Sequence, residues 1–116
     1  MRSVTVMING EEKQLRFDIN STSDLEEYFG EGIAGILQTE QMGFRLVRAF
    51  YWAGLKWKDR GLTLERTGKL LNNKVTEEGE SLDSLMKPVL KALEVSGLMG
   101  KDFKVPDDEE EEEVKN

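Results

Sequence analysis

The fold is decided by two short alternating runs around an Asn-Gly pair, in the stretch SVTVMINGEEKQLRFDI at residues 3–19. Apolar residues share one face on each side of the pair: Val4, Val6 and Ile8 before it, and Leu15, Phe17 and Ile19 after it. Asn9 and Gly10 both tolerate the positive φ of a tight turn, so the pattern predicts a β-hairpin. The turn length stays open, because residues 11–13 could extend the loop. A lone hairpin is marginally stable in water, so we expect its apolar face to pack on helices.

Helical patterns fill most of the remaining chain. The strongest runs from about Gln41 to Trp57, where residues of one face recur every three or four positions: Gly43, Leu46, Val47, Phe50, Tyr51 and Gly54. We expect this segment to be the central core helix. Gly54 either admits a neighbouring helix closely or loosens the last turn.

Two shorter helical segments are expected ahead of this one, the first from a capping signal and the second from apolar spacing. Ser23 and Glu26 have the spacing of a capping box, which predicts a helix from Asp24 to about Phe29, stopped by Gly30. Its buried stripe would be Leu25, Tyr28 and Phe29. After it we expect a loop leading into a short helix, with Ile33, Ile36 and Leu37 at helical spacing.

Two more helices are predicted towards the C-terminus. Thr63 is placed to cap a helix from Leu64 to about Leu71, which the pair Asn72-Asn73 would end. A longer amphipathic helix is expected from about Ser81 to Val95, closed by Gly97. Pro88 lies inside this pattern and should kink the helix or begin a second segment, because proline has no N–H to donate.

These patterns predict a mostly helical α+β fold, with an N-terminal hairpin followed by about four or five helices in one globular domain at residues 1–105. The acidic run Asp107 to Glu113 has nothing apolar to bury, so residues 106–116 are expected to be a disordered tail. The run supplies much of the net charge of −7. The tail is either a solubilising appendage, which we favour, or a mask for a basic surface.

The residues that are absent exclude several classes of function. The chain has no Cys and no His, which removes disulfides, thiolate sites and the commonest general base and metal ligand. We therefore expect no enzyme, no metal and no cofactor. The sequence shows no signal-peptide pattern and no apolar run of the roughly 20 residues that cross a bilayer, so we expect a cytoplasmic protein with no membrane contact.

A basic segment at residues 45–74 offers one candidate surface. Its only acidic residues are Asp59 and Glu65, and Trp52 and Trp57 lie among its cations. The eight cations are Arg45, Arg48, Lys56, Lys58, Arg60, Arg66, Lys69 and Lys74. Cations beside aromatic rings can bind nucleic acid, which would make the chain a small regulatory protein. We favour the other interpretation, in which the cations cover polar helix faces and the Trp rings fill the core.

The order of motifs resembles the tail assembly chaperones of long-tailed bacteriophages and prophages of Gram-positive hosts. The similar features cover most of residues 4–97: Ile8-Asn9-Gly10 with Leu15-Arg16-Phe17, Leu25-Glu26-Glu27-Tyr28-Phe29-Gly30, Tyr51-Trp52-Ala53-Gly54-Leu55-Lys56, Leu62-Thr63-Leu64-Glu65 and Lys91-Ala92-Leu93-Glu94-Val95-Ser96-Gly97. The acidic ending is not part of the resemblance.

The resemblance implies a non-enzymatic assembly factor that binds the tape-measure protein, and the tail tube protein, in the host cytoplasm and is absent from the mature virion. Exposed parts of Trp52, Leu55 and Trp57 are the contact residues that we nominate, since large aromatic side chains carry much of the energy in helix-in-groove contacts. The same three residues could instead belong to the core. A surface meant for an apolar client is also expected to favour self-association when the client is absent.

Overall fold

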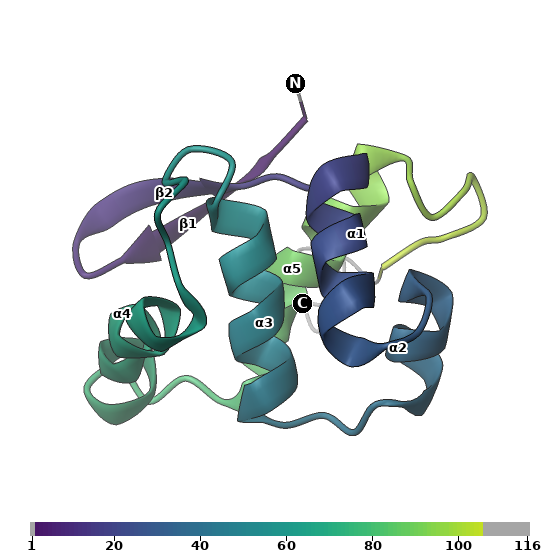
Figure 1. The fold of residues 1–116 in the computed structure, drawn as a ribbon. Coiled ribbons are helices and arrows are strands. Elements are labelled where there is room, and N and C mark those ends of the chain that lie inside the picture. Colours follow the sequence, from purple (N-terminus) through teal and green to yellow (C-terminus); the bar gives the residue numbers. More distant parts are fainter. Residues whose placement is uncertain (1, 106–116) are drawn as a thin grey trace, which may run out of the picture.

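The protein is an antiparallel hairpin followed by five helices, as the computed structural model in Figure 1 shows for residues 2–105, the part of the chain that it describes. The elements are β1 (Val4–Ile8), β2 (Glu11–Leu15), α1 (Ile19–Phe29), α2 (Ile33–Thr39), α3 (Phe44–Leu55), α4 (Leu64–Thr76) and α5 (Leu82–Ser96). The predicted α+β class is confirmed. The acidic tail predicted at residues 106–116 lies outside the described residues.

The hairpin has the tight turn that its Asn-Gly pair favours. Asn9 and Gly10 have φ values of 55° and 78°, and β1 pairs with β2 in the register that sets Ile8 opposite Glu11. Residues 11–13 therefore belong to the second strand rather than to a longer loop. The prediction for Ile19 is wrong: the strand stops at Leu15, and Ile19 is 71% exposed at the start of α1.

Helix α1 begins earlier than the capping pattern at Ser23 predicts. The N-cap is Asp18, whose carboxylate accepts the Ser21 N–H at 2.9 Å, while the Ser21 hydroxyl accepts the Asp18 N–H at 2.9 Å. This capping box satisfies two backbone donors, and it starts the helix about one and a half turns before the position that the Ser23 pattern predicts. The end is as predicted, because Gly30 takes the left-handed conformation at φ 76°.

Helix α3 is the centre of the core. It contacts α1, α4, α5 and β2, and Figure 1 shows it between α1 and α4. The predicted stripe is buried from Leu46 to Gly54, and Phe50 and Tyr51 are both fully buried. Side chains of this size each contribute about 1.5–3 kcal/mol when buried. The predicted central helix is thus confirmed, although Gly43 is its N-cap and not part of its buried face.

Helix α4 starts as predicted and ends later. The Thr63 hydroxyl accepts the Arg66 N–H at 3.1 Å, but Asn72-Asn73 does not stop the helix, which continues to Thr76. Tertiary contacts explain the extension. Asn73 donates to the Asn9 side chain at 3.0 Å, and Lys74 donates to the Met7 carbonyl at 2.7 Å, so the last turn of α4 is held against the hairpin.

Helix α5 is continuous from Leu82 to Ser96 through Pro88, so the prediction of a second segment beginning there is wrong. The Ser81 cap and the Gly97 stop agree with the sequence pattern. The Tyr51 hydroxyl donates to the Leu85 carbonyl at 2.6 Å, which fastens α5 to α3 within one turn of Pro88.

Among residues 2–105, no helix has the length and apolar character that crossing a membrane requires.

Candidate functional site: a groove between α3 and α4

The three nominated contact residues do not form an open surface. Leu55 is 6% exposed and belongs to the core, so its nomination as a contact residue is corrected. Trp52 and Trp57 are half-buried, and their indole N–H groups donate to the carbonyls of Leu62 and Gln14, each at 3.0 Å. Both rings serve to hold neighbouring segments in place.

A cation also covers each of these rings. The Lys56 ammonium lies 4.3 Å from the ring centroid of Trp52, and the Arg16 guanidinium lies 4.8 Å from that of Trp57. Cations at this distance are attracted to the face of an aromatic ring. A partner would have to displace them before it could stack on either ring.

The basic segment at residues 45–74 is largely neutralised by neighbouring carboxylates. Five of its cations make ion pairs: Arg45 with Glu40, Lys56 with Asp24, Arg66 with Asp59, Lys69 with Glu65, and Lys74 with Glu78 and Glu80. The Lys74 side chain is in addition only 9% exposed. The cations that lie close together in the sequence therefore belong to several separate ion pairs in the fold.

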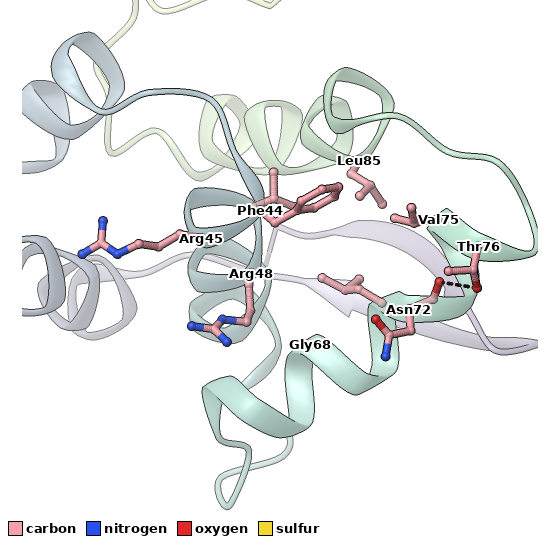
Figure 2. A pocket seen from close by; sticks show the side chains of 10 residues that line it. Phe44, Arg45, Arg48, Gly68, Asn72, Val75, Thr76 and Leu85 are labelled. Atoms are coloured by element: carbon pink, nitrogen blue, oxygen red, sulfur yellow. Dashed lines mark hydrogen bonds between the residues drawn. The ribbon is translucent and has the colours of Figure 1, made fainter.

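An apolar hollow lies between α3 and α4 beside the start of α5 (Figure 2). Its volume is about 490 Å³. We call it the α3–α4 groove, and its lining residues are Phe44, Arg45, Val47, Arg48, Gly68, Leu71, Asn72, Val75, Thr76 and Leu85. None of these residues is acidic.

The groove has an apolar end and a basic end. Figure 2 shows the Phe44 ring directed towards Val75 and Leu85, whereas Arg48 lies on the side of Gly68. Phe44 is 59% exposed, and Met42 just before the helix is 45% exposed. Exposed large apolar side chains at the rim of an apolar hollow are typical of sites that bind another protein.

Gly68 lets the Arg48 side chain lie close against α4 at the basic end. A Cβ atom at this position would lie 3.3 Å from Arg48 Cδ, so a larger residue would press on the arginine. The Arg48 Nε atom is buried and has no hydrogen-bond partner among the described residues. Arg45 differs from it, because its guanidinium turns away from the groove and lies over the rings of Tyr28 and Phe29 at 5.0 and 4.9 Å.

Two other hollows are more polar. One, of about 420 Å³, lies between β2 and the α3–α4 connection and is lined by Glu11, Glu12, Lys13, Gln14, Leu55, Lys58, Asp59, Leu62 and Leu70. The other, of about 510 Å³, is lined by Arg16, Asp18, Asn20, Ser21, Asp24, Lys56, Trp57 and Arg60. Both hollows are lined by cations as well as carboxylates, so each contains side chains of opposite charge.

The described residues contain no cluster of three or more Asp and Glu that could hold a metal ion. Glu31 and Glu40 lie close together, and a hydrogen bond from Glu31, with burial and the Glu31 charge, raises the pKa of Glu40 despite the nearby Arg45. This pair lines none of the three hollows, whereas paired acid–base catalysis needs carboxylates fixed around a substrate site.

Sequence reasoning missed Phe44, Gly68 and Val75 as parts of a site. The sequence signal that could have indicated the site is Phe44 together with Met42. Both are large apolar residues that do not belong to the buried stripe predicted for the central helix. No family model matches the chain, and neither a curated protein nor a solved structure matches it. The resemblance to tail assembly chaperones therefore stays a prediction from the motifs.

Proposed function

We propose that the protein is a non-enzymatic tail assembly chaperone of a long-tailed bacteriophage or prophage, which binds the tape-measure protein during tail morphogenesis. The observation that supports this best is the α3–α4 groove, with its exposed Phe44 at the rim and its apolar floor of Val47, Leu71, Val75 and Leu85. A groove of this kind suits the apolar face of an amphipathic helix.

The physical logic agrees with the motif resemblance. A tape measure is a very long helical chain with apolar stripes, which aggregates unless those stripes are covered. A small binder with an open groove can cover one stripe at a time and leave when tube subunits replace it. The tail tube protein is the second partner in this proposal, and the complex acts in the host cytoplasm and is absent from the finished virion.

Co-expression with the tape-measure protein encoded beside this chain tests the proposal. We expect the chain to raise the soluble yield of the tape measure and to co-purify with it. A Gly68→Leu variant, whose larger side chain would push Arg48 into the basic end of the groove, should lose the complex. Lys69→Leu adds the same side chain one residue away on the exposed face and should keep it. A tape measure that stays insoluble with the unmodified chain contradicts the proposal.

The nucleic-acid alternative has weaker support. Phosphate contacts need cations that face solvent without carboxylate partners, and five of the eight cations in the segment have such partners. A salt-sensitive mobility shift with DNA or RNA would favour that alternative over the chaperone.

A further inference from the structure

We propose that the α3–α4 groove selects an amphipathic helix that carries a carboxylate beside its apolar stripe, and that Arg48 binds this carboxylate. The inference rests on the proposed function, because it specifies the chemistry of the client segment. It is carried by the charge and burial of the groove residues.

Arg48 is equipped to receive an anion. Its buried Nε atom has no hydrogen-bond partner among the described residues, and the side chain as a whole is only partly buried, so its terminal amino groups are the donors that an occupant could reach. A guanidinium presents its donors in a planar fork that matches the two oxygens of a carboxylate. Since no lining residue of the groove is acidic, a carboxylate of the occupant would meet no competing carboxylate from the groove at Arg48.

The spacing of the lining residues suggests the form of the occupant. Phe44 and Arg48 are one helical turn apart on α3, and Gly68 to Val75 spans two turns on α4, or about 10 Å. An occupant helix would place apolar residues at positions i, i+3 or i+4, and i+7 against this length. Its carboxylate would then fall about one turn from the apolar residue that contacts Phe44.

The acidic run of the chain itself is a poor occupant by composition. Residues 107–113 are all Asp or Glu, so the run has charges for Arg48 and no apolar side chain for the space beside Phe44, Val75 and Leu85. A partner helix that combines both features satisfies both ends of the groove.

Binding of two synthetic helices of about 20 residues, long enough to hold helical structure, tests the inference with the full chain. Both carry a Leu stripe, and they differ in whether Glu or Lys lies beside it. We expect the Glu peptide to bind about tenfold or more tightly than the Lys peptide. Arg48→Glu should reverse this preference, while Arg60→Glu, an exposed position outside the groove, should leave it unchanged. Reversal of the charge preference excludes unfolding as the cause of lost binding.

Equal binding of both peptides would overturn the inference, and so would the same effect from Arg60→Glu as from Arg48→Glu. A dimer of the chain that Gly68→Leu abolishes would also overturn it, because the groove would then bind a second copy of the chain. Its failure is separable from that of the proposed function. A tape measure that co-purifies equally with Arg48→Glu overturns only the carboxylate contact. Selective peptide binding without any tape-measure complex supports the inference and overturns the chaperone.

Discussion

Gly54 lies directly against Leu15, so closely that a Cβ atom on Gly54 would stand 2.8 Å from Leu15 Cδ2 and 3.1 Å from Phe17 Cζ. The Arg16 N–H donates to the Gly54 carbonyl at 2.9 Å in the same place. The missing side chain thus lets the end of the hairpin, and not another helix, approach the last turn of α3. This contact holds the hairpin against the central helix.

Gly54→Ala should therefore destabilise the fold by about 1–3 kcal/mol, because the added methyl group overpacks a buried contact. Gly35→Ala is the matched control, since a Cβ there meets only the flexible Glu31 side chain. The control should be neutral or stabilising by up to about 1 kcal/mol, as alanine favours a helix over glycine. Urea unfolding measures both. Effects of the same sign and size would contradict the account of Gly54.

Tyr51→Phe should cost about 1–2 kcal/mol of unfolding free energy. The substitution removes the buried hydroxyl that donates to the Leu85 carbonyl at 2.6 Å and leaves that carbonyl without this partner. Tyr28→Phe, at a half-buried position, should change stability by less than about 0.5 kcal/mol. If both variants unfold at the same urea concentration, the Tyr51 hydroxyl does not fasten α5 to α3.

Alkaline pH should destabilise the protein through the same tyrosine. Burial, and secondarily the charge of Glu80, raises the pKa of Tyr51 above that of a free tyrosine. Above about pH 10 the unfolded chain loses this proton while the folded chain retains it, so stability falls as pH rises, by about 1.4 kcal/mol per unit from this group. Tyr51→Phe should lack this component of the slope. Parallel stability curves for the two proteins between about pH 10 and 11 would refute it.

Lys74→Met should destabilise the fold by about 1–3 kcal/mol, although the variant keeps the aliphatic stem. The lysine donates to the Met7 carbonyl at 2.7 Å and lies 3.3 Å from the Glu80 carboxylate, with its side chain almost fully buried. Lys69→Met removes an exposed pair with Glu65 and should change stability by less than about 1 kcal/mol. Thermal or urea unfolding that ranks the two variants equally would show that Lys74 does not anchor the hairpin.

Turns and helix caps that depend on adjacent residues could be predicted from the sequence. Helix ends that depend on contacts between distant segments could not. The Asn9-Gly10 turn and the Thr63 cap depend on a few adjacent residues, so their signals are direct. The start of α1 was predicted wrongly because Asp18 with Ser21 and Ser23 with Glu26 both have cap chemistry. The end of α4 was missed because contacts with the hairpin, through Lys74 and its neighbour, stabilise its last turn.

The groove could not be predicted for a related reason. It depends on which face of α4 turns towards α3, and this places Gly68 beside Arg48 although the two residues are 20 positions apart. Trp52 and Trp57 have the largest side chains of the basic segment, yet each indole N–H donates to a backbone carbonyl of the same chain. A large aromatic residue is a candidate for a binding surface only when the fold leaves it uncovered, as it does with Phe44.

The most direct test of client binding in the groove is an NMR titration of the ¹⁵N-labelled chain with a soluble fragment of the tape-measure protein. The account predicts shifts of the backbone amides of Phe44, Arg48, Gly68 and Val75, while the indole N–H signals of Trp52 and Trp57 stay in place because both are hydrogen-bonded within the chain. Movement of the indole signals with Gly68 unchanged, or no shift at saturating fragment, would contradict it.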